Sequence, residues 1–141
     1  MIVNTVTTIE APAENIWKTI RAYDNVERWN PLVTNSKISG TVEGSERICE
    51  VQFGDQKKEV VENLDLVDEE NKTFKVSVVK GPPQISGQQS TFQVKSLSEN
   101  KTKLLISTDV ENDSNHASEG WQEAFQMMSQ GLKKLHEKEV I

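Results

Sequence analysis

The sequence is poor in cysteine, and Cys49 is the one cysteine among its 141 residues. A lone cysteine excludes a disulfide within the chain and any metal site built from several thiolates. Such sparing use of cysteine is typical of a reducing compartment, so we expect a cytoplasmic protein. The sequence also lacks an apolar run approaching the ~20 residues of a membrane-spanning helix, and its start lacks the pattern of a signal peptide. We therefore expect no stable membrane insertion.

Positive charge is scarce as well. The chain carries 16 Lys+Arg against 22 Asp+Glu, a net charge of −6, which argues against nucleic acid as a partner because that interaction needs a basic surface. It has no internal repeat, low-complexity tract or linker-like stretch, so we expect one domain over residues 1–141. Three Trp, four Phe and many β-branched residues are nevertheless enough for a folded core.

The pattern of apolar residues changes along the chain. Residues 2–9 are rich in β-branched side chains and predict a strand, and helical spacing after Pro12 predicts a short helix. Asp24 stands where it can cap a second helical turn. Period-two alternation then predicts six further strands, at residues 33–39, 47–53, 57–67, 73–79, 88–97 and 103–111. Short turn-rich connections favour antiparallel pairing of these strands.

The last segment predicts an amphipathic helix of about 20 residues, with Ser118 as its N-cap. One apolar stripe runs along it, made of Trp121, Phe125, Met128, Leu132 and Leu135. Gly131 interrupts this helix at a cost of about 1 kcal/mol relative to Ala, either because a strand or a ligand approaches closely or as a tolerated imperfection. The elements together indicate an α+β domain in which the helix covers one face of the sheet.

Several segments resemble a known superfamily. They are residues 9–17 (IEAPAENIW), 29–33 (WNPLV), 61–65 (VENLD), 81–83 (GPP) and 90–94 (STFQV). In this order they are similar to START-like (Bet v 1-like, SRPBCC) domains, which include the polyketide cyclase/dehydrase and lipid-transport family. The resemblance implies a helix-grip fold, a curved seven-stranded antiparallel sheet around the long C-terminal helix with two short helices after the first strand. It also implies a cavity between sheet and helix.

The resemblance leaves several functions open, since members bind lipids, sterols, hormones or polyketides, act as cyclases or activate chaperones. The plant hormone receptors of this superfamily anchor the ligand carboxylate with a lysine on the second strand. This chain has Thr34 at that position, and it has Gln88 where the receptors carry an aromatic residue. We therefore do not expect this chain to bind abscisic acid, the hormone of those receptors.

Glu62 is the carboxylate of most interest. It shares strand parity with Val60 and Leu64, which puts one acid in an apolar row, and the resemblance also places a cavity-facing glutamate here. A dry cavity would favour the protonated form and make Glu62 a candidate proton donor or polar anchor. The alternative is that this face is exposed to solvent, because Val61 and Val67 give the opposite face some apolar character.

The remaining chemically active side chains suggest structural roles. Cys49 shares parity with Val51 and Phe53 and is expected to be a small buried hydrophobe. His116 and His136 are expected at the surface and do not form a recognisable metal site. No phosphate-binding loop or dinucleotide fingerprint is present, so we expect no cofactor.

The first hypothesis is a protein that binds or carries a small apolar or amphipathic ligand, such as a lipid or polyketide, as a monomer or weak homodimer. The expected ligand contacts are Val51, Phe53, Glu62, Leu64, Ser90, Phe92, Val94, Trp121, Phe125 and Met128. A second hypothesis is a cyclase or dehydratase in which Glu62 transfers protons without metal or nucleotide. A third is a protein-interaction module, which a cavity filled by the protein's own side chains would favour.

Overall fold

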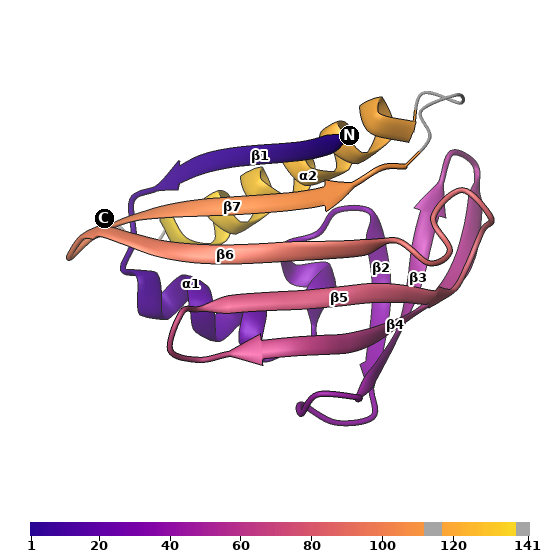
Figure 1. The fold of residues 1–141 in the computed structure, drawn as a ribbon, viewed down its shortest axis with the longest axis horizontal. Coiled ribbons are helices and arrows are strands. Elements are labelled where there is room, and N and C mark those ends of the chain that lie inside the picture. Colours follow the sequence, from indigo (N-terminus) through magenta and orange to yellow (C-terminus); the bar gives the residue numbers. More distant parts are fainter. Residues whose placement is uncertain (112–116, 138–141) are drawn as a thin grey trace.

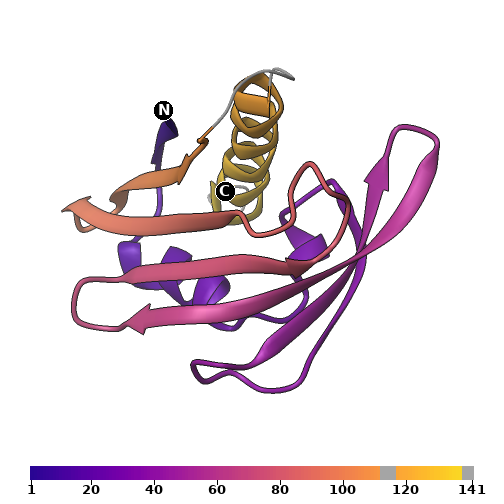
Figure 2. The same cartoon turned by 45° about the vertical axis from the view of Figure 1, so that its right-hand side comes forward.

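The computed structural model describes residues 1–111 and 117–137. A seven-stranded antiparallel sheet, in the order β1-β7-β6-β5-β4-β3-β2, curves around one long helix (Figures 1 and 2). The elements in chain order are β1 (Ile2–Ile9), α1 (Ala13–Arg21), the 3-10 helix η1 (Val26–Arg28), β2 (Val33–Ile38), β3 (Glu46–Phe53), β4 (Gln56–Asp68), β5 (Thr73–Lys80), β6 (Gln89–Ser98), β7 (Lys101–Asp109) and α2 (Ala117–Glu137). This architecture confirms the predicted α+β helix-grip fold.

The predicted strands are all present, and their ends differ from the expected ones by two residues or fewer. Two capping predictions are wrong. Asp24 does not cap η1, because Asn25 takes that position in a left-handed conformation with φ 52°, which asparagine tolerates better than most residues. Ser118 is not the N-cap of α2, because the helix begins one residue earlier, at Ala117.

The core lies between the concave face of the sheet and the helices. Ile16 and Ile20 of α1 are fully buried, as are Phe125 and Leu132 on the predicted stripe of α2. Burying each such side chain is worth roughly 1.5–3 kcal/mol, so these contacts hold both helices against the sheet. Trp17 is also buried, and its indole Nε1 donates a hydrogen bond to the Glu69 carboxylate at 2.9 Å.

Gly131 is required because the backbone at Trp29 approaches α2 there. A Cβ added at residue 131 would lie 1.7 Å from the Trp29 carbonyl oxygen, far inside van der Waals contact. The part of the chain that approaches Gly131 is therefore the segment after η1, and the close approach is made by neither a strand nor a ligand. The Trp29 ring packs edge-on against Phe92 with the centroids 6.0 Å apart. Trp29 thus fixes the distance between α2 and the sheet.

The other face of the sheet is polar. Asp65 on β4 accepts hydrogen bonds from Asn63 at 2.7 Å, from Gln89 at 2.8 Å and from Ser77. Partial burial acts to raise the pKa of Asp65, but the three hydrogen bonds outweigh it and the pKa is lowered. Lys75 on β5 alternates with the buried Phe74 and Val76 and therefore points to the same face as Asp65. Among the described residues, no helix is long and apolar enough to cross a bilayer.

Two buried hydroxyls on the inner side should respond oppositely to removal. Ser129 Oγ in α2 has no hydrogen-bond partner, whereas Thr102 Oγ1 donates to the Ala11 carbonyl at 2.7 Å. An unsatisfied buried polar group costs free energy, so Ser129→Ala should raise the free energy of unfolding by about 1 kcal/mol. Thr102→Val should lower it by about 1 kcal/mol. Urea unfolding measures both free-energy changes, and changes of the same sign for the two variants would contradict this prediction.

Candidate functional site

A cavity of about 510 Å³ lies between the concave face of strands β3 to β6 and α2. Alternation along each strand directs every second side chain towards it, and the apolar stripe of α2 closes the opposite side. Its wall consists mainly of aliphatic, aromatic and methionine side chains. These apolar wall residues are Val26, Trp29, Leu32, Val33, Val51, Phe53, Val60, Val76, Val78, Ile85, Phe92, Trp121, Met127 and Met128.

The residues predicted to contact a ligand divide into two groups. Seven of the ten line the cavity: Val51, Phe53, Glu62, Ser90, Phe92, Trp121 and Met128. The other three, Leu64, Val94 and Phe125, do not line this cavity and are packed in the core instead. Leu64 and Val94 share the inward faces of β4 and β6 with lining residues but lie farther along those strands. Phe125 lies between lining residues along α2 but is packed in the core. The pattern of apolar residues does not make this distinction.

One ion pair stands in the apolar wall. Arg47 on β3 directs Nε and Nη2 to the same Glu62 oxygen, Oε1, each at 2.8 Å. The Arg47 side chain is 7% exposed and that of Glu62 is 19% exposed, so the pair is almost removed from solvent. Glu62 therefore faces the cavity as expected, but it does so as the partner of a buried cation.

Tyr23 completes the surroundings of Arg47. The guanidinium lies 4.4 Å from the centroid of the Tyr23 ring, and Nη1 donates to the Tyr23 carbonyl oxygen at 3.1 Å. Burial acts to lower the pKa of Arg47, but the interactions with Glu62, Cys49 and Tyr23 together outweigh it and the net shift is upward. Burial also raises the pKa of Tyr23, whose hydroxyl donates to the Glu62 backbone oxygen at 3.1 Å. Arg47 stays charged and Tyr23 stays neutral.

Cys49 is buried, as predicted, with Sγ 3.6 Å from Glu62 Oε1. Burial and the negative charge of Glu62 raise the pKa of the thiol to about 12. Because the thiolate is the reactive form, we expect iodoacetamide to label Cys49 at least about a hundredfold more slowly in the folded protein than in urea. Intact-mass spectrometry over time measures both rates, and comparable rates would contradict a buried, protonated thiol.

Sequence reasoning missed two important wall residues. Arg47 shares strand parity with Cys49, so a cation two residues before a buried thiol was a readable signal that the strand face carries charge. Trp29 also lines the cavity, but its dual contact with α2 and Phe92 depends on tertiary packing and has no local signal.

The structure describes one of the two histidines. His136 is half-buried, and its Nε2 lies 2.9 Å from Thr19 Oγ1, so it joins α2 to α1 and is less exposed than predicted. His116 lies outside the described residues. Within residues 1–111 and 117–137, no group of three or more His, Cys, Asp or Glu side chains is placed to hold a metal ion.

Comparisons with known proteins agree with this geometry. Solved structures with the same fold include an uncharacterised protein from Bacillus thuringiensis, with a TM-score of 0.80, 19% sequence identity, and 96% of this chain and 98% of that chain covered. A protein from Nitrosospira multiformis has a TM-score of 0.80 and 18% identity, with 96% of each chain covered. A START superfamily protein from Mycobacterium smegmatis has a TM-score of 0.82 and 14% identity, with 97% of each chain covered. No curated protein matches the sequence. The model of the polyketide cyclase/dehydrase and lipid transport family matches residues 1–139, and the chain belongs to that family.

Proposed function

We propose that this protein binds and carries a small, mainly apolar molecule in the cavity between its sheet and α2. The observation that carries the proposal is the unfilled volume of about 510 Å³ with a predominantly apolar wall. That volume falls within the ~300–1,000 Å³ of sites that enclose small molecules. Membership in a family described by polyketide chemistry and lipid transport supports the same conclusion.

The ion pair indicates one polar feature of the ligand. The contacts from Arg47 and Cys49 all end on Oε1 of Glu62, and no described residue donates a hydrogen bond to Oε2. Glu62 Oε2 is therefore an acceptor available at the cavity wall. A ligand with a hydroxyl or another hydrogen-bond donor would satisfy it, whereas an ionised ligand carboxylate has no donor to offer.

Matched pairs of ligands test this proposal. We expect a long-chain alcohol or a phenolic polyketide to raise the melting temperature, whereas the carboxylic acid of the same skeleton should raise it less. A ligand present at a hundred times its Kd stabilises by about 2.7 kcal/mol, which is easily measured by thermal shift. A panel of fatty alcohols, sterols and aromatic polyketides that produces no shift would contradict ligand carriage. Stronger stabilisation by the acids would contradict the role of Glu62.

The two alternative functions have less support. A cyclase would need proton-transfer groups free to react, but Glu62 is paired with Arg47 and the Tyr23 hydroxyl is directed to a backbone oxygen. A protein-interaction module would be favoured by a cavity filled with the protein's own side chains. In this structure, by contrast, the cavity beside α2 is not filled by side chains.

A further inference from the structure

We propose that the free edge of β1 pairs with the same edge of a second copy of this chain, so that the two sheets join across a two-fold axis. β1 forms one end of the seven-stranded sheet, and none of its residues from Ile2 to Ile9 carries a charge. Natural proteins usually protect an edge strand with charge, proline or a bulge, because unpaired backbone groups are a template for another strand.

The hydrogen bonds to β7 show which groups of β1 point to the open side. Met1 and Val110 exchange two backbone hydrogen bonds, at 3.0 Å and 2.8 Å. Bonded and non-bonded residues alternate along an antiparallel pair, so Val3 and every second residue after it face β7. The N–H and C=O groups of the intervening residues, Ile2, Asn4, Val6 and Thr8, therefore point away from the sheet.

Thr8 is already occupied, because Lys133 Nζ donates to its carbonyl oxygen at 3.2 Å. The open stretch is therefore Ile2 to Val6. An antiparallel second copy centred on Asn4 places Ile2 opposite Val6 of the partner subunit and Asn4 opposite Asn4 of the partner subunit. In this register Ile2, Asn4 and Val6 each donate one backbone hydrogen bond and accept one.

The exposed side chains agree with this register. Ile2 is 62% exposed and Val6 is 56% exposed, high values for large apolar residues of a strand. The symmetric pairing places Ile2 of each copy opposite Val6 of the partner subunit, and apolar cross-strand pairs of this kind are stabilising. α2 packs along β1, and its Lys133 reaches the outward side of the strand at Thr8, which lies outside the stretch from Ile2 to Val6.

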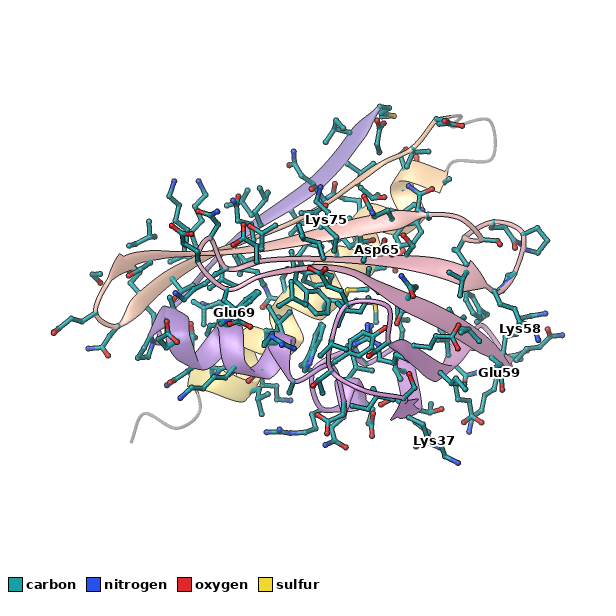
Figure 3. The ribbon with its side chains drawn as sticks, turned by 60° about the horizontal axis from the view of Figure 1, so that its bottom comes forward. Lys37, Lys58, Glu59, Asp65, Glu69 and Lys75 are labelled. Atoms are coloured by element: carbon teal, nitrogen blue, oxygen red, sulfur yellow. The ribbon has the colours of Figure 1, made fainter. Side chains whose placement is uncertain are left out.

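The opposite edge of the sheet has the protection that β1 lacks. β2 contains an irregularity in its pairing with β3 between Val33 and Asn35, and a bulge of this kind twists an edge away from a partner. It also carries Lys37, which Figure 3 shows projecting outward. Pairing through β2 would place a lysine on each copy at the new junction, so the contrast assigns self-association to β1.

Sedimentation of the full chain over a wide concentration series tests the interface. We expect the average mass to rise with concentration from 15.9 kDa towards twice that value. Val6→Lys should weaken self-association at least about tenfold, because it puts charge on the edge. Val79→Lys is the matched control, since Val79 is 50% exposed on the central strand β5 and should change nothing. A monomer at every concentration, or equal effects of both variants, would overturn the proposal.

Cysteine cross-linking tests the register. Asn4→Cys should form an intermolecular disulfide under mild oxidation, because opposed residues in a bonded pair have Cα atoms about 5.5 Å apart, within disulfide range. Val6→Cys should not cross-link, because it faces Ile2 of the partner subunit and not its own equivalent. Cys49 is buried and should not compete. Cross-linking of Val6→Cys at the rate of Asn4→Cys would contradict pairing centred on residue 4.

Discussion

Gly131→Ala should lower the free energy of unfolding by about 1–3 kcal/mol or more, although alanine is the better helix former by about 1 kcal/mol. The added methyl group would lie 1.7 Å from the Trp29 carbonyl oxygen, and a backbone atom cannot move aside as a flexible side chain can. Either α2 or the segment around Trp29 must shift. Because Trp29 also lines the cavity, the shift should change ligand affinity as well.

Gly120→Ala is the matched control on the same helix. A Cβ at residue 120 meets no atom within 4 Å, so the substitution keeps only the helix-propensity gain. We expect it to stabilise the protein by up to about 1 kcal/mol. Urea unfolding of the two variants should therefore give effects of opposite sign. Stabilisation by Gly131→Ala would show that α2 does not dock closely on Trp29.

Glu62→Gln should destabilise the protein by about 3–5 kcal/mol, because it keeps the shape of the side chain but leaves Arg47 buried without a counter-charge. Arg47→Met should cost less. It leaves the charge on Glu62, which is the more exposed partner and borders the cavity, where water can reach it. The order of these two effects follows from which charge is more deeply buried.

A double variant separates the cost of an unpaired charge from the value of the pair. Replacing both partners, as Arg47→Met with Glu62→Leu, removes both charges and should bring stability to within about 2 kcal/mol of the wild type. Chemical unfolding of the wild type, Arg47→Met, Glu62→Leu and the double variant completes the cycle. A Glu62→Gln protein as stable as the wild type would contradict a desolvated Arg47.

The fold was predictable because its signals are local. Alternating apolar residues between 33 and 111 define strands, and the stripe from Trp121 to Leu135 defines the face of α2 that packs on the sheet. Helix ends were less predictable, since Ser118 is as good a capping residue as any near it. The backbone contact that requires Gly131 joins residues about a hundred positions apart, and nothing local to either residue identifies the other.

The site was predictable in part for the same reason. Parity correctly placed Glu62 and Phe92 towards the interior, but it does not say how far along a strand the cavity extends. Val94 shares its face with Phe92 and packs in the core instead. The pairing of Glu62 with Arg47 depends on the β3–β4 register, in which these two residues are directly opposite. Register is set by the turn and the whole hydrophobic pattern, not by either residue alone.

Native mass spectrometry of the protein with a long-chain alcohol tests the central claim most directly, when wild type is compared with Ala124→Phe. Ala124 lines the cavity from α2, so a phenyl ring there should fill part of its volume. Ala22→Phe is the control, because Ala22 is exposed and outside the cavity. We predict a one-to-one complex for wild type and Ala22→Phe, and at least about tenfold weaker binding for Ala124→Phe. No complex with the wild type, or equal binding by all three proteins, would contradict a ligand held between the sheet and α2.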